Sequence, residues 1–222
     1  MAEDALPLTS QPLGVLYDPI LAYRFLYPTA TVSAKPLSMV LARAPEKYSS
    51  SPPLSSDARQ RIVSELIDLR QFVTATMTVG PASGVLKDNP PDTWKPKEVA
   101  LTVLIDRSTS RLSSGQRVAL NDVEEAHLED REGRPYWVFE HLSQGSPTVS
   151  NNSKESYRHA LGVTTYRKTE DGTPYLYTLN MACPQSMWLD LQPLFAKAID
   201  SFRLVDTNSE FISPDKNPWL FF

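Results

Sequence analysis

The stretch YRHALGVTTYRKTEDGTPYLYTLNMA, residues 157–182, indicates an antiparallel sheet. Residues 157–168 are rich in β-branched and aromatic side chains, and residues 175–182 repeat that composition after a short polar break. The break, 170–174, contains Asp171 and Gly172, a pair that favours the backbone conformation of a tight hairpin turn. The sequence therefore predicts two strands joined by a hairpin.

The pattern continues towards both ends of this stretch. Before it, a strand is predicted at 136–142, YWVFEHL, and a loosely alternating segment at 122–130 precedes it across a turn at 131–135. After it, apolar residues recur at helical spacing and predict a closing helix. These residues are Trp188, Leu191, Phe195, Ala198, Ile199 and Phe202. The second half of the chain is thus predicted to be a β-meander followed by a helix.

The first half is predicted to contain strands and two further helices. Strands are expected at 22–27, 37–43 and 72–79, with Tyr23, Phe25 and Tyr27 forming the buried face of the first. One helix is expected to begin at Ser55 or Ser56, because Ile62, Leu66 and Leu69 follow at helical spacing. The other is expected to begin at Pro96. Together these elements predict an α+β fold, an antiparallel sheet covered by helices.

Composition limits the classes of function. The chain has 222 residues and a net charge of −4, and we see no basic stripe of the kind that nucleic acid requires. No apolar run reaches the roughly 18–20 residues that span a bilayer. The single cysteine, Cys183, is expected to be a buried apolar residue. The first 14 residues lack the basic and apolar regions of a targeting segment, so we expect either a cytosolic protein or a processed form.

The candidate metal ligands are histidines on predicted strands and nearby carboxylates. If the middle strands pair, His141 and His159 could approach each other, and Glu124 and Glu129 belong to an acidic segment at 122–132. Carboxylates of this kind could hold Ca²⁺ or Mn²⁺. The alternatives are polar positions on a half-buried strand and an edge strand protected from aggregation by its charges.

No catalytic motif is recognised, and we expect the protein not to be an enzyme. Ser113 and Ser114 lack a nucleophile elbow and a partnered histidine in recognisable order. The segment GPASG, 80–84, lacks the lysine of a phosphate-binding loop. We expect no resident cofactor other than the Ca²⁺ or Mn²⁺ considered above.

The candidate partner-binding residues lie in a Pro-rich loop and at the C-terminus. The loop carries Lys87, Trp94, Lys95 and Lys97, and an exposed tryptophan beside lysines is typical of an interface anchor. The alternative is that Trp94 packs at the start of the helix. The aromatic residues of the C-terminal segment are Trp219, Phe221 and Phe222. We expect an extended arm at 1–21, a domain at 22–205 and an aromatic tail at 206–222.

Four segments in the same order resemble the PsbP family of the thylakoid lumen. They are AYRFLYP (22–28), ARQRIVSELIDLRQFVTATMTVGP (58–81), GRPYWVFEHL (133–142) and YLYTLNMACPQSMWLDLQPLFAKAIDSFRL (175–204). The resemblance covers roughly residues 20–205. It implies an α/β/α sandwich of the Mog1 and PsbP type, a central antiparallel sheet flanked by helices.

The resemblance also implies a function. PsbP itself is an extrinsic subunit on the lumenal side of photosystem II that aids Ca²⁺ and Cl⁻ retention. Its paralogues are mostly assembly or repair factors for photosystem II, photosystem I or the chloroplast NDH complex. The arm, the connector at 44–56, the loop at 80–95 and the tail depart from PsbP. We therefore expect an auxiliary factor that binds photosystem II, peripheral to the thylakoid membrane, as a mature lumenal chain without its transit peptide.

Overall fold

The computed structural model describes residues 12–45, 60–112, 118–145 and 156–216. Most strands within these residues belong to one seven-stranded sheet in the order β3-β4-β5-β9-β8-β7-β6. Its members are β3 (Val40–Arg43), β4 (Arg61–Asp68), β5 (Val73–Pro81), β6 (Val118–Arg131), β7 (Arg134–Gly145), β8 (Ser156–Lys168) and β9 (Pro174–Pro184). Every neighbouring pair in this sheet is antiparallel.

The predicted hairpin of 157–182 is confirmed as β8 and β9, which lie near the middle of the sheet. Thr164 pairs with Thr178, and the two hydroxyls are hydrogen-bonded at 2.9 Å. In the turn, Gly172 has a φ of +85°, a conformation that glycine adopts without strain. Because β8 and β9 are buried over most of their length, this hairpin is the centre of the fold.

A second, three-stranded sheet has the order β1-β2-β10, formed by β1 (Leu13–Asp18), β2 (Tyr23–Pro28) and β10 (Arg203–Leu204). The prediction of an extended arm over 1–21 is therefore wrong for Leu13–Asp18, which pair antiparallel with β2. Tyr23 and Phe25 of β2 are buried, and Tyr27 packs against the same core, as the alternation predicted. Residues 1–11 lie outside the described part of the chain.

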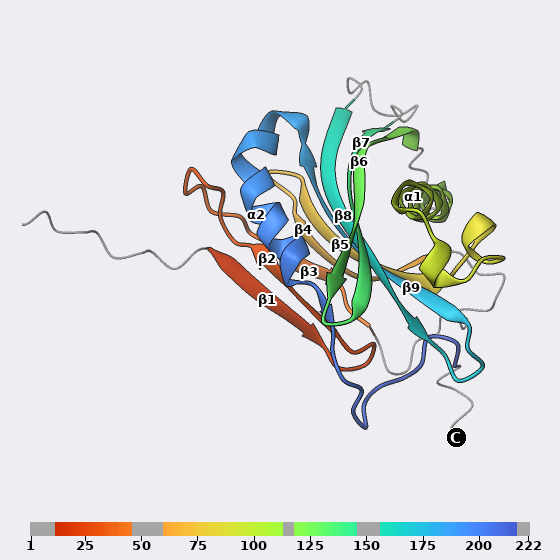
Figure 1. The fold of residues 1–222 in the computed structure, drawn as a ribbon. Coiled ribbons are helices and arrows are strands. Elements are labelled where there is room, and N and C mark those ends of the chain that lie inside the picture. The colour runs from red at the N-terminus through yellow and green to blue at the C-terminus, as the bar shows by residue number, and fades with distance from the viewer. Residues whose placement is uncertain (1–11, 46–59, 113–117, 146–155, 217–222) are drawn as a thin grey trace, which may run out of the picture.

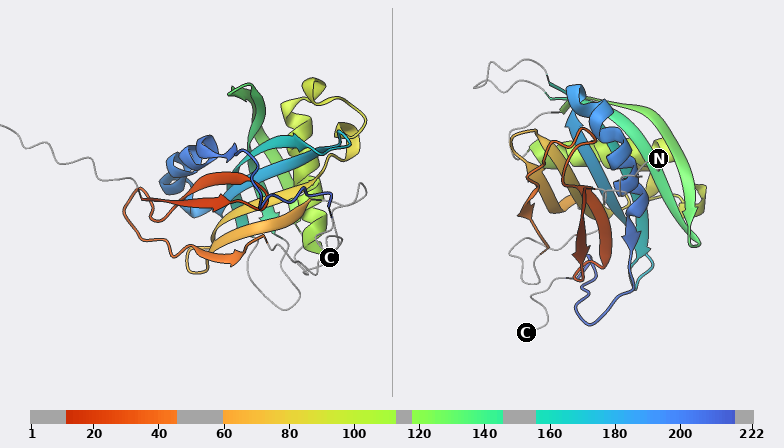
Figure 2. Two further views of the ribbon diagram at one scale, coloured as in Figure 1. Left: turned by 90° about the horizontal axis from the view of Figure 1, so that it is seen from below. Right: turned by 90° about the vertical axis from the view of Figure 1, so that its left-hand side faces the viewer.

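The two α-helices in the described part of the chain lie on opposite faces of the large sheet (Figure 1). Helix α1 (Pro96–Leu112) covers β6 and β7, whereas α2 (Trp188–Ser201) and the small sheet cover the other face. Short 3₁₀ turns, η1 (Gly84–Leu86), η2 (Pro91–Thr93) and η3 (Gln185–Met187), precede the helices. Figure 2 shows the same layers from two further sides. The expected α+β class, with an antiparallel sheet between helices, is thus confirmed.

Each face of the sheet has its own hydrophobic core. The larger core lies under α2 and β2 and contains Tyr23, Met77, Tyr177, Trp188 and Phe195. The smaller core lies under α1, around Trp94, Trp137, Phe139 and Val103. Burial of a large aromatic or aliphatic side chain contributes about 2–3 kcal/mol, so both cores hold the helices firmly on the sheet.

The helix predicted across Ile62, Leu66 and Leu69 is wrong, because this segment is strand β4. Leu66 pairs with Ala75 of β5 and with Leu41 of β3, and a bulge between Ile62 and Ser64 shifts the alternation. Leu69 is exposed in the following turn rather than on a buried helical face. The local apolar pattern fits the periodicity of a helix as well as that of a strand, and the backbone hydrogen bonds to two flanking strands decide in favour of the strand. The expected caps, Ser55 and Ser56, lie outside the described residues.

The tail predicted at 206–222 folds back on the domain over its described part. The backbone N–H of Ile212 donates to the carbonyl of Ile20 at 2.8 Å, and Arg167 stacks on the ring of Phe211 with its guanidinium carbon 5.3 Å from the ring centre. Residues 206–216 are therefore part of the body of the protein.

Candidate functional site

The two candidate metal-binding histidines lie on opposite faces of the sheet. His141 of β7 pairs with Ala160 of β8, and His159 of β8 pairs with Leu142 of β7, so the two histidines are one position out of register. Successive side chains of a strand point to opposite faces. The imidazole Nε2 of His141 lies 2.7 Å from Oδ1 of Asn180 on the α1 side. The predicted His141–His159 pair is therefore wrong.

His159 instead meets two carboxylates on the α2 side. Its Nε2 lies 2.5 Å from a carboxylate oxygen of Glu140 and 3.4 Å from one of Glu124. One donor atom from each of these three residues falls within 4.8 Å of the others. We call Glu124, Glu140 and His159 the carboxylate–histidine cluster.

Two neighbours orient the imidazole of His159. Its Nδ1 lies 2.9 Å from Oε1 of Gln185, and because an amide oxygen only accepts hydrogen bonds, Nδ1 carries the proton there. The ring also stacks on Trp188, with centroids 3.6 Å apart and planes 8° from parallel. His159 is itself buried, so its Nε2 is held facing the two carboxylates.

Strand geometry explains why the sequence found only part of the cluster. Val123 packs in the core under α1, so the next residue, Glu124, points to the α2 side. Glu140 points there too, because it precedes His141 on β7. Sequence reasoning missed Glu140 and Gln185. Glu140 could have been predicted from the alternation of β7. It lies two residues before Leu142, which pairs with His159, so both side chains point to the same face.

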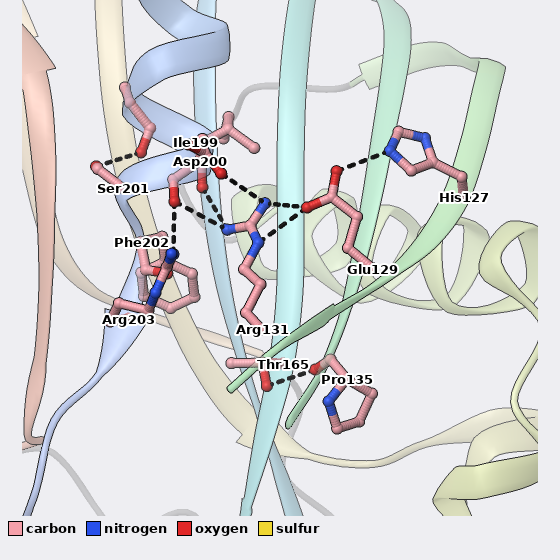
Figure 3. Close-up of polar contacts among 11 residues, drawn as sticks. His127, Glu129, Arg131, Pro135, Thr165, Ile199, Asp200, Ser201, Phe202 and Arg203 are labelled. Atoms are coloured by element: carbon pink, nitrogen blue, oxygen red, sulfur yellow. Dashed lines mark hydrogen bonds and ion pairs between the residues drawn. The ribbon is translucent and has the colours of Figure 1, made fainter. Parts of the chain in front are cut away.

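Glu129 belongs to a different network, which Figure 3 shows. Its carboxylate accepts hydrogen bonds from Nε and Nη2 of Arg131 at 2.9 and 2.6 Å and lies 3.0 Å from Nε2 of His127. Burial raises the pKa of Glu129, but the bonds from Arg131 and His127 outweigh burial and hold that pKa below its usual value. Arg131 also donates to the carbonyl of Ile199. Glu129 is therefore a structural partner rather than a member of the carboxylate–histidine cluster.

Trp94 is buried, so it cannot be the exposed anchor considered from the sequence. Its ring centroid lies 5.4 Å from that of Trp137 and 5.7 Å from that of Tyr166, and its Nε1 donates to the carbonyl of Asn89 at 2.9 Å. The alternative, packing at the helix start, agrees with the structure. Lys87, Lys95 and Lys97 are exposed.

The remaining candidates give no further site in the described residues. Trp219, Phe221 and Phe222, like Ser113 and Ser114, lie outside them. Cys183 is buried, and burial, opposed by nearby Arg158, raises the pKa of its thiol to about 12. The described helices are all too short or too polar to cross a bilayer.

Comparisons with known proteins agree with the fold. The PsbP family model matches residues 82–204. PsbP domain-containing protein 5, chloroplastic, of Arabidopsis thaliana is 39% identical over 223 aligned residues, which cover 99% of this chain and 73% of that protein. The solution structure of cyanobacterial PsbP from Synechocystis superposes with a TM-score of 0.51 at 17% identity, covering 90% of this chain and 96% of that one. The Ran-binding protein Mog1p of Saccharomyces cerevisiae gives 0.44 at 10% identity, with 89% and 97% covered. Because the family model matches more than half of the chain and the plant relative aligns with almost all of it, this chain belongs to the PsbP family.

Proposed function

We propose that the protein is a non-enzymatic auxiliary factor of the chloroplast thylakoid lumen. It binds the lumenal side of photosystem II during assembly, repair or stabilisation of the oxygen-evolving side. The proposal is supported by membership of the PsbP family and by likeness to a chloroplastic relative over 99% of the chain. Alternative partners of the same kind are photosystem I and the chloroplast NDH complex.

The observation that carries the proposal is a group of exposed lysines on a firmly held segment. Lys87 and Lys95 lie between β5 and α1, Lys97 lies in the first turn of α1, and we call these three residues the lysine platform. Asp88 and Asp92 are also exposed there, and Nζ of Lys95 lies 3.4 Å from a carboxylate oxygen of Glu98. The surface therefore presents charges of both signs and favours a partner surface with a complementary charge pattern.

Trp94 gives the platform its rigidity. Its backbone carbonyl accepts a hydrogen bond from Nε1 of Trp137 at 3.3 Å, and its own indole is fixed by Asn89 and Tyr166. The side chains of the lysine platform therefore project from a backbone that Trp94 holds in place. Binding a partner then costs less conformational entropy than it would from a loose loop.

Charge reversal tests this docking surface. A tagged chain carrying Lys87→Glu, Lys95→Glu and Lys97→Glu is expected to lose co-purification with photosystem II subunits from thylakoids. A matched variant, Lys168→Glu with Lys197→Glu, changes exposed lysines of other elements and is expected to retain it. Equal recovery of photosystem II subunits by both variants would contradict the proposed surface. If the parent chain co-purifies with subunits of photosystem I or of the NDH complex instead of photosystem II, that complex is the partner.

A second candidate function, metal binding, is favoured by the carboxylate–histidine cluster. One imidazole nitrogen and two carboxylates make a donor set that suits Mn²⁺ or Zn²⁺ better than Ca²⁺, which prefers six to eight oxygens. The bond from Nδ1 of His159 to Gln185 resembles the outer hydrogen bonds that orient histidine ligands. Such a site would make the protein an ion-retention module.

Calorimetry separates this candidate from simple ion pairing. Titration with Mn²⁺, Zn²⁺ and Ca²⁺ is expected to show binding of Mn²⁺ or Zn²⁺ that Glu140→Gln abolishes. Glu129→Gln is the matched control, because Glu129 is a similarly placed carboxylate outside the cluster. The absence of heat at near-millimolar metal would remove the metal function and leave the docking function untouched.

A further inference from the structure

Four large apolar side chains are exposed together at one end of the molecule. Val32, Leu69, Phe72 and Leu189 have 59%, 73%, 61% and 90% of their surfaces exposed, and we call these four residues the apolar tips. They come from three segments: the β2–β3 connection, the β4–β5 turn and the first turn of α2. Figures 1 and 2 show these segments at the same end of the molecule, with the β2–β3 connection between the other two. Exposed apolar residues gathered in this way mark an interaction surface more often than scattered ones do.

The β4–β5 turn that carries Leu69 and Phe72 is rigid. The carboxylate of Asp68, 1% exposed, accepts backbone N–H bonds from Arg70 at 2.8 Å and Gln71 at 2.7 Å through Oδ1. Its other oxygen accepts from the N–H of Ser38 at 2.6 Å. The same buried side chain therefore shapes the turn and fastens it to the β2–β3 connection.

A second carboxylate fastens the tips of the β2–β3 connection and α2 to each other. Asp190 accepts from the backbone N–H of Ser33 at 2.8 Å and from its hydroxyl at 2.6 Å. The backbone carbonyl of Asp190 accepts from the N–H of Val32 at 3.1 Å. Val32 is thus bonded to the turn of α2 that carries Leu189, and the β2–β3 connection is hydrogen-bonded to both of the other segments.

The backbone of Phe72 is strained although its ring is exposed. Its φ is +55°, in the left-handed region, which a bulky side chain rarely adopts and which costs roughly 1–2 kcal/mol. A glycine or asparagine would relieve that strain, and the exposed ring gains little packing in return. Strain held at an exposed aromatic points to a role outside the folding of the chain.

We propose that the apolar tips insert into the interfacial layer of a lipid membrane and hold the protein against it. Side chains that protrude singly from turns fit a fluid acyl layer, which needs no complementary shape. Lys35 and Arg70 lie on the same two turns and are exposed, so their charges would stand at the level of anionic headgroups while the tips enter the layer.

A lipid surface fits these observations better than a protein surface does. Anchors of protein interfaces are mostly Trp, Tyr and Arg seated in well-packed pockets, whereas the tips are three aliphatic residues and one phenylalanine on three segments. The carboxylate nearest Val32 and Leu189 is that of Asp190; Ser33 donates to it, and Lys35 lies close enough for its positive charge to offset that carboxylate. Glu124 and Glu140 face His159. This inference does not depend on which photosynthetic complex the protein binds.

Vesicle flotation tests the inference with the full chain. The protein is expected to float with phosphatidylcholine vesicles that contain phosphatidylglycerol, and more weakly without it. Phe72→Asn with Leu189→Ser is expected to weaken binding by at least roughly tenfold. Leu128→Ser, on the exposed edge strand β6, is the matched control and should bind as the parent does.

Two results would overturn the inference. One is a parent chain that floats with neither vesicle, and the other is a double variant that floats as well as the parent. Loss of a thylakoid complex by the double variant, with no vesicle binding by the parent, would make the tips a protein interface instead. Because asparagine tolerates a positive φ and Leu189 is 90% exposed, the double variant should melt close to the parent temperature, and this melting measurement separates lost binding from unfolding.

Discussion

Arg131 and Ile199 are 68 residues apart in sequence, yet Nη1 of Arg131 donates a 2.8 Å hydrogen bond to the carbonyl oxygen of Ile199. The bond lies at the C-terminal end of α2, where the carbonyl of Ile199 also accepts from the N–H of Phe202 at 3.3 Å. Figure 3 shows that the same guanidinium also holds Glu129 of β6. One side chain therefore fastens the helix to the far edge strand of the large sheet.

Replacing Arg131 is expected to destabilise the protein substantially. Arg131→Met removes the donor to Ile199 and the partner of Glu129, and we expect the free energy of unfolding to fall by about 2 kcal/mol. Urea denaturation followed by circular dichroism measures this change. Lys168→Met, at an exposed position, is the control and should stay within about 0.5 kcal/mol of the parent. A similar small effect for both variants would show that the guanidinium bonds add nothing to stability.

The contribution of Asp68 to stability is expected to depend on pH. Burial raises the pKa of Asp68, but the backbone N–H bonds from Gln71, Ser38 and Arg70 outweigh it and lower that pKa below its usual value. Because the folded-state pKa is lower than the unfolded-state one, the stabilisation is full above about pH 4 and is lost as the pH falls through the folded-state value.

Asp68→Asn tests this dependence. The variant is expected to be less stable than the parent by about 1–2 kcal/mol at pH 7, and the difference should shrink as the pH falls below about 4. Thermal melts of both proteins across pH 2–7 give the comparison, with exposed Asp92→Asn as control. A difference that stays constant down to pH 2 would mean that the charge of Asp68 is not what stabilises the turn.

Gly162 is expected to be intolerant of any side chain. A Cβ there would lie 2.4 Å from Cε2 and Cζ of Phe139, a ring buried in the core under α1. Gly162→Ala should therefore lower the free energy of unfolding by about 1–3 kcal/mol. Adding Phe139→Leu should restore part of the loss, because the smaller side chain vacates that space. If the two substitutions are simply additive, the close approach of Gly162 and Phe139 is not the cause.

Cys183 is expected to be unreactive in the folded protein. Its thiol is buried, with a pKa raised to about 12, so almost no thiolate is present at pH 8. Labelling with a thiol-reactive disulfide reagent should follow the unfolding transition in urea. Rapid labelling of the native chain would contradict the burial of this side chain.

The sequence alone determined the central and C-terminal parts of the fold. The β8–β9 hairpin, strand β7 and helix α2 were predicted because each carries its own strong signal: an Asp-Gly turn, a run of aromatic residues, or apolar residues at helical spacing. The start of α1 at Pro96 was marked by proline. Such local signals need no knowledge of neighbouring strands.

The tertiary structure decided the rest, because the rest depends on pairing. Residues 61–68 are a strand because β3 and β5 flank them, and Leu13–Asp18 because β2 lies alongside. Likewise, His159 pairs with Leu142 of β7, so it shares a face of the sheet with Glu140 and not with His141. A shift of the register by one residue would reverse this. A sequence specifies alternation along each strand, but only the register between strands brings particular side chains together.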